Sequence, residues 1–205
     1  MAFERIGYGQ VEPNQLSAQK TGQIYASLPL DANVSVLQNG EFMYYDYATG
    51  KVTAGDESTV GEPMLVFNEI KLYEPFWQTS YKDFAMIRVG DNYVTSRLAT
   101  AAYGENSDKQ QAATINPAHT EYGYRMDGIA PRLMKTNIGD IYTTNMVKTG
   151  TDVTYAAGDV LKLKKTDRNT LELDKDGDID TVQFVVAKVY TMPDGQAGLK
   201  LQRVK

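Results

Sequence analysis

The sequence predicts an all-β protein made of two tandem small β-barrel or sandwich modules, with an extended N-terminal arm and a long insertion between the modules. The 205 residues include 14 tyrosines and 17 glycines. Aromatic residues favour half-buried strands, and glycines favour turns. Short apolar segments alternate with turn signals, and no segment keeps a helical period over three turns. Similar short motifs occur in both halves of the chain.

Residues 1–20 are predicted to form the extended arm. Gly7, Gly9, Pro13 and Asn14 disfavour a helix, and apolar residues are too sparse for a core element. Two interpretations stay open: a mobile terminus, and an arm that lies along a neighbouring subunit.

The first module is predicted to span residues 21–79. Its segments have the short, apolar or aromatic character of strands, and Asn39-Gly40 is a turn signal. A second turn is expected over residues 48–51. The strands are expected at 23–26, 34–37, 41–47, 64–67 and 70–73.

Residues 80–137 are predicted to be an insertion between the modules, which is too long for an idle loop in a compact domain. Its middle part, residues 103–120, is polar and is expected to be an exposed loop. Two short strands are expected before that loop, at 84–89 and 93–94.

The second module is predicted to span residues 138–205. Apolar and polar residues alternate in residues 160–164, as in a strand with one solvated face. The remaining strands are expected at 140–143, 153–155, 171–173, 183–190 and 198–204.

Three pairs of short motifs recur at nearly equal intervals in the two modules. They are Gly22-Gln23-Ile24-Tyr25 with Gly139-Asp140-Ile141-Tyr142, Gly40-Glu41-Phe42 with Gly158-Asp159-Val160, and Lys71-Leu72-Tyr73 with Lys188-Val189-Tyr190. The spacing favours an internal duplication. The alternative is that two β-segments use the same turn chemistry by coincidence.

Composition argues against several classes of partner. The formal net charge is -5, and charges of both signs are interspersed, so the sequence lacks the basic stripe typical of nucleic-acid binding and of binding to anionic membranes. Cysteine is absent, which fits synthesis in a reducing cytoplasm. We see no signal peptide after Met1 and no apolar run of about 20 residues.

No motif predicts a catalytic, cofactor-binding or metal site. The single histidine, His119, lies in a polar loop context, and phosphate-binding glycine loops are missing. Residues Asp174–Asp180 carry four aspartates at alternate positions, but an EF-hand loop would need Gly at Ile179 and Glu at Val185. An acidic turn is therefore favoured over a weak cation site. An enzyme with two carboxylates that converge in space stays a minor alternative.

Aromatic segments are the candidate binding surfaces. Alternation puts Tyr45 and Tyr47 on one strand face and Tyr44 on the other, and a second aromatic segment ends at Trp77. Core packing is the alternative for these side chains. The predicted partner-binding residues are Phe3, Arg5, Tyr8, Tyr45, Tyr47 and Trp77.

The opening Met-Ala-Phe-Glu-Arg-Ile-Gly-Tyr-Gly, the repeated Gly-Gln/Asp-Ile-Tyr motif and the segments 131–145 and 155–161 resemble small virion proteins of tailed bacteriophages, in particular capsid decoration and head-stabilising proteins. The resemblance covers residues 1–75 and 131–205. It implies a β-rich, non-enzymatic protein on the outer capsid surface, made in the host bacterial cytoplasm. It also implies the major capsid protein as partner, self-association with a trimer favoured, and an arm that crosses subunit boundaries.

Two other classes of function stay open. One is a different virion component, such as a tail, baseplate or connector protein. The other is a carbohydrate-binding β module that uses the tyrosine and tryptophan surface.

Overall fold

A computed structural model describes residues 3–5, 9–34, 36–56, 59–68, 86–88, 131–193 and 195–205. This part of the chain is predominantly β, as predicted. The helix is α1 (Ala18–Thr21), and the strands are β1 (Val11–Gln15), β2 (Ile24–Tyr25), β3 (Val36–Gln38), β4 (Phe42–Asp46), β5 (Lys51–Thr53), β6 (Met64–Val66), β7 (Met86–Arg88), β8 (Leu133–Met134), β9 (Ile141–Thr144), β10 (Val160–Lys165), β11 (Leu171–Asp174), β12 (Ile179–Thr191) and β13 (Ala197–Arg203).

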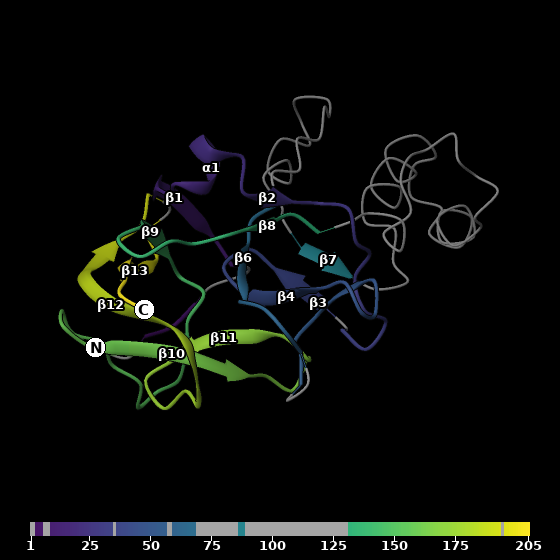
Figure 1. The fold of residues 1–205 in the computed structure, drawn as a ribbon. Helices are drawn as coiled ribbons and strands as arrows, with labels where there is room; N and C mark the ends of the chain where they lie inside the picture. Colours follow the sequence, from purple (N-terminus) through teal and green to yellow (C-terminus); the bar gives the residue numbers. More distant parts are fainter. Residues whose placement is uncertain are drawn as a thin grey trace, which may run out of the picture.

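Most strands belong to one large antiparallel sheet (Figure 1). Its order is β1-β9-β13-β12-β10-β11-β4-β6-β8-β2, with β5 paired to β4, while β3 and β7 form a separate pair. The pairing between β11 and β4 consists of Leu171 opposite Phe42. The two parts of the sheet on either side of this pairing therefore join at one narrow seam.

Two sets of five strands on either side of this seam have the same order. The first strand set is β2-β8-β6-β4-β5, and the second strand set is β9-β13-β12-β10-β11. Their registers also correspond: Phe42–Leu65, Leu65–Met134 and Ile24–Met134 in the first set match Val160–Val185, Val185–Gln202 and Ile141–Gln202 in the second. The hairpin pair Tyr45–Val52 likewise matches Leu163–Leu173.

The turns that open β4 and β10 have one geometry. Gly40 and Gly158 have φ of 92° and 93°, a region that favours glycine. The amide of Gly40 donates to Val66 O, and that of Gly158 donates to Val186 O. In both turns the next residue, Glu41 or Asp159, accepts a backbone N–H bond from the residue three positions earlier. Each carboxylate thereby closes its own turn.

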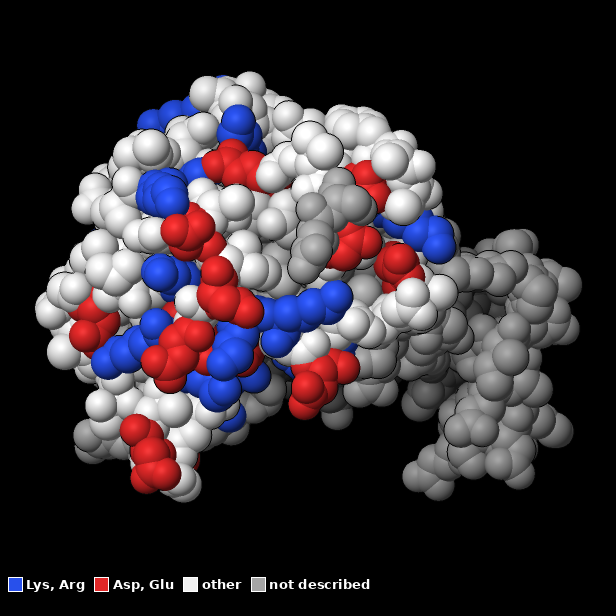
Figure 2. Space-filling model, turned by 60° about the horizontal axis from the view of Figure 1, so that its bottom comes forward, with Lys and Arg blue, Asp and Glu red and all other residues white. Residues whose placement is uncertain are grey.

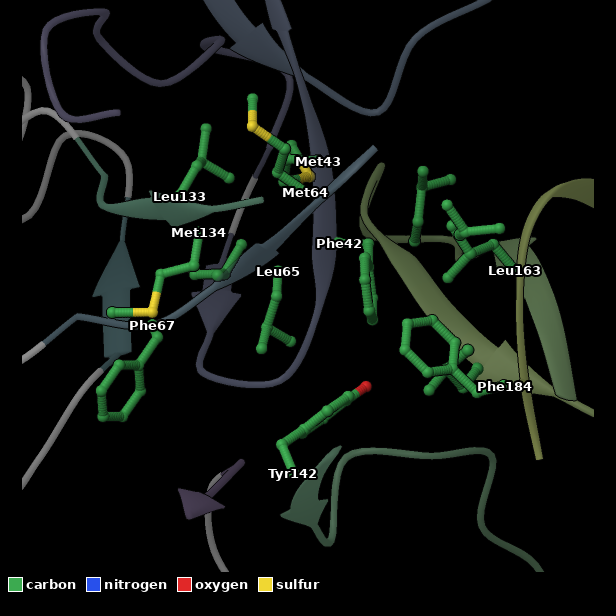
Figure 3. Close-up of a cluster of buried hydrophobic side chains, with 14 of the residues drawn as sticks. Phe42, Met43, Met64, Leu65, Phe67, Leu133, Met134, Tyr142, Leu163 and Phe184 are labelled. Carbon is green, nitrogen blue, oxygen red and sulfur yellow. The ribbon is translucent and has the colours of Figure 1, made fainter. Parts of the chain in front are cut away.

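The two strand sets share one hydrophobic core (Figure 3). Phe42 of β4 lies against Phe184 of β12, with ring centroids 5.4 Å apart, and Tyr142 of β9 meets Phe184 edge-on at 5.6 Å. All three side chains are fully buried, and so is Leu65 of β6. The contact between the sets is thus part of the core rather than a surface junction.

The N-terminal segment packs against the second half of the chain, which differs from the arm predicted for residues 1–20. Strand β1 pairs with β9, Leu16 is buried, and residues 18–21 form a short helix. Asp140 holds the start of this helix by accepting bonds from Ser17 N and Ser17 Oγ. In the described residues, the segment is therefore an edge element of the sheet.

The boundaries of the predicted insertion also differ from those observed. Leu133–Met134 and Met86–Arg88 fall inside the predicted insertion, residues 80–137, but they pair with strands of the first module. Asn68 and Arg132 bracket the intervening stretch, and Arg132 N donates to Asn68 Oδ1 at 2.7 Å. Residues 153–155 do not form a strand, whereas residues 51–53 do, so the turn expected over residues 48–51 ends before Lys51. The strands expected at 70–73 and 93–94 and the loop 103–120 lie outside the described residues.

Candidate protein-binding groove

A surface hollow of about 310 Å³ lies on the first strand set. It is formed where the end of β2, the end of β4 and the segment leading into β6 come together. We call it the tyrosine groove, and its lining residues are Tyr25, Tyr45, Tyr47, Val60, Gly61, Glu62, Met64 and Lys135.

Three tyrosine rings form one wall of the groove. Tyr45 lies between Tyr25 and Tyr47, at centroid distances of 5.3 Å and 5.2 Å. The Tyr45 hydroxyl accepts a bond from Ser27 N at 3.2 Å, which fixes the middle ring. Tyr47 is 75% exposed, and Val60, which also lines the groove, is 89% exposed. Large apolar side chains that stay exposed together are typical of interaction sites.

A charged group is held rigidly beside these rings. Glu62 accepts a bond from Arg203 of β13, and Lys135 Nζ lies 3.9 Å from its other oxygen. Arg203 is itself buried and also donates to Thr136 O. Glu62 therefore links the groove wall to the second strand set.

Beyond Tyr47 and Val60 the surface continues into a second hollow, which Asp46, Thr49, Asp56 and Thr59 help to line. Hydrogen bonds from the Thr49 hydroxyl and from Ala48 N hold the pKa of Asp46 below its usual value. The carboxylate is exposed and stays ionised at neutral pH. One end of the groove is thus negatively charged.

The predicted partner-binding residues separate into three groups. Tyr45 and Tyr47 lie together in the groove. Phe3 is 3% exposed and meets Tyr155 edge-on at 5.1 Å, so it is a core residue here rather than a surface contact. Arg5 donates to Met146 Sδ, and its pKa is lowered chiefly by burial. Tyr8 and Trp77 lie outside the described residues.

Sequence reasoning missed Tyr25 and Val60 as partners of Tyr45 and Tyr47. Strands β2 and β4 are not paired with each other, so strand alternation alone does not bring their side chains together. The signal available was the exposed character of Val60 between Thr59 and Gly61, in a turn-rich stretch with no apolar neighbour.

An ion pair with a fully buried carboxylate lies at the seam, and neither of its residues lines the groove. Glu41 is fully buried and accepts bonds from Arg168 Nη2 at 2.6 Å and Thr170 Oγ1 at 2.9 Å. Burial raises the pKa of Glu41, and the positive charge of Arg168 opposes that rise. Burial likewise raises the pKa of Glu172, which the charges of Arg5 and Arg168 oppose. The bonds of Glu41 with Arg168 and Thr170 therefore join the turn before β4 to the segment between β10 and β11.

The acidic segment Asp174–Asp180 does not gather its carboxylates. Asp174 is buried and lies 3.5 Å from Lys148 Nζ, while Asp180 pairs with Lys205 at 3.1 Å. Across the described ranges, no group of three or more His, Cys, Asp or Glu side chains is placed to hold a metal ion. On the face shown in Figure 2, acidic and basic side chains are interspersed.

No known protein family matches the sequence, and neither the curated proteins nor the solved structures include a match. In the part of the chain that the structure describes, no helix has the length and apolar character required to cross a membrane.

Proposed function

We propose that this chain is a structural rather than catalytic protein, which works by binding other protein surfaces. In this proposal the chain binds the major capsid protein on the outer capsid surface of a tailed-phage virion. The role is that of a decoration or cementing protein. The resemblance of residues 1–75 and 131–205 to such proteins supports this role, and so does the predominantly β architecture.

The tyrosine groove is the observation that carries the proposal. Tyr47 and Val60 are among the most exposed large apolar side chains of the described chain, and they face one hollow. Tyrosine is enriched in protein interfaces because it buries a large area at low entropic cost. Ring contacts hold the groove in shape before any partner binds, which lowers the entropic cost of association.

We also propose that the two strand sets derive from one duplicated β module. The support is the common strand order, the matching registers and the common turn at Gly40 and Gly158. The third recurring motif pair includes residues 71–73, which lie outside the described residues.

Labelled electron microscopy tests the virion assignment. Antibody raised against the purified chain is applied to particles from lysates of cells that carry the gene. Gold label on the outside of heads supports the decoration role. Label confined to tails or baseplates favours the other virion assignment, and particles free of the chain contradict both.

Carbohydrate binding is a second candidate, favoured by the exposed Tyr47 ring beside the charged pair Glu62 and Lys135. Aromatic rings with adjacent polar groups are suited to sugar rings. A glycan array with the wild-type chain and with Tyr45→Ala tests it. Binding lost in the variant supports this candidate, and absence of signal at millimolar sugar removes it.

A further inference from the structure

The second strand set has a surface equivalent to the tyrosine groove, but there the equivalent side chains are covered by other parts of the chain. The matching registers of the two strand sets make Tyr25 equivalent to Tyr142, Tyr45 to Leu163 and Met64 to Phe184. In the second set, these positions are fully buried. In the first set, both tyrosines are only half-buried and line an open hollow.

The first strand set faces this equivalent surface with one row of side chains. The row crosses four neighbouring strands and consists of Phe42, Leu65, Met134 and Ile24. Directly paired residues project from the same face of a sheet, so the row presents one apolar surface. Phe42 lies beside Phe184, and the Tyr142 hydroxyl points toward them (Figure 3). Phe42 of this row therefore makes the contact with the face of the second strand set that carries Phe184 and Tyr142.

The second strand set carries the corresponding row on its outside. We call it the Val160 row, and it consists of Val160, Val185, Gln202 and Ile141, paired in the same registers. Val160 stands at the position of Phe42 and is 44% exposed, and Gln202 is exposed. An outward sheet face normally carries polar residues at alternate positions, yet three members of this row are apolar. The first strand set thus has an open groove with no row packed in it, and the second strand set has an exposed row that packs in no groove.

We propose that a second copy of this chain seats its Val160 row in the tyrosine groove, repeating between molecules the contact that joins the strand sets within one. Such a contact is head-to-tail, so it closes into a ring or continues as an open chain according to its rotation. Charge supports the match, because Lys162 follows Val160 on the same strand face and Asp46 lies at the negative end of the groove. The inference takes from the proposed function only that the groove binds protein.

Sedimentation velocity tests the contact with two variants, one on each side of it. Tyr47→Ser alters the groove, Val160→Asp alters the row, and both side chains are exposed in the single chain. Val189→Asp is the matched control, because Val189 is also 44% exposed but lies outside the row. The wild type is expected to associate between about 1 µM and 1 mM, the range of small interfaces. Each row or groove variant should weaken association at least about ten-fold, and the control should not.

Mixing the two variants separates a head-to-tail contact from a symmetric one. The Tyr47→Ser chain keeps its row and the Val160→Asp chain keeps its groove, so the mixture is expected to form heterodimers that neither chain forms alone. A wild type that stays monomeric, oligomers indifferent to both variants, or no rescue on mixing would overturn the inference. If the wild type is monomeric while Tyr47→Ser still abolishes particle binding, the proposed function stands and only this inference fails.

Discussion

At the scale of single residues, the Tyr142 hydroxyl is expected to lower the free energy of unfolding, and this can be tested. Its hydroxyl is fully buried and has no hydrogen-bond partner among the described residues, and burial raises its pKa well above the usual value. An unpaired buried hydroxyl destabilises the fold, so Tyr142→Phe should raise the free energy of unfolding by about 1 kcal/mol. Urea denaturation measures the change. Tyr25→Phe, at the half-buried counterpart, should change it by less than about 0.5 kcal/mol.

Glu41 gives a prediction about pH. Its pKa is raised in the folded chain above the usual 4.5, so the folded state binds a proton more readily than the unfolded state. The stability from this group is present below pH 4.5 and is lost as pH rises through the folded pKa. Glu41→Gln should therefore flatten the decline in unfolding free energy above pH 4.5 and cost less than about 1 kcal/mol at neutral pH.

Glu41→Ala should cost more, about 2–4 kcal/mol, because it leaves the bonds from Arg168, Thr170 and Gln38 without their acceptor. Glu4→Gln, on an exposed residue, is the control for added or lost charge. Urea titrations at several pH values measure both effects. A glutamine variant with the pH slope of the wild type would rule out burial of Glu41 as the cause.

At the scale of elements, the two glycine turns predict unequal tolerance. A Cβ at Gly40 would lie 2.5 Å from Met146 Cβ and 2.7 Å from Thr144 Oγ1, whereas one at Gly158 would meet nothing within 4 Å. Both turns have a positive φ, which costs alanine about 1–2 kcal/mol. Gly158→Ala should cost that amount, and Gly40→Ala at least about 3 kcal/mol. Equal losses in thermal or urea unfolding would contradict the packing at Gly40.

The strands that sequence predicts best are those with strong alternation, and β10, β12 and β13 are examples. Strand β8 has two residues, too few for a period to be visible, and its partners come from residues 24–25 and 65–66. Strand β1 contains Pro13, which argues against a central strand. Its place at the sheet edge tolerates proline, because an edge strand can leave an N–H position unused.

The groove could be predicted only in part, because alternation within one strand does not show which distant segments lie beside it. Alternation along β4 put Tyr45 and Tyr47 on one face, and the structure places both in the hollow. Tyr25 comes from a strand that is not paired with β4, and Val60 lies outside the strands, so a local pattern does not show that they meet these two tyrosines. Phe3 looked like an arm residue because its partners, Gly150, Val153 and Tyr155, are far away in sequence.

At the scale of the whole molecule, the shared core predicts one cooperative unit. Phe42→Ala removes a buried ring between the strand sets and should cost about 3–5 kcal/mol. Val160→Ala, at the matching exposed position, should cost less than about 1 kcal/mol at concentrations where the chain is monomeric. Far-UV circular dichroism during urea unfolding should give a single transition for the wild type. Two separate transitions would indicate that the strand sets are independent.

The central claim is that the tyrosine groove binds the surface of another protein molecule. Hydroxyl-radical footprinting measures this at the side chains themselves, with the chain free in dilute solution and with the chain assembled on particles or with its own copies. Modification of Tyr47 and Val60 should fall on assembly, while that of the exposed Val189 stays constant. Unchanged modification of Tyr47 and Val60 in the assembled protein would contradict the claim.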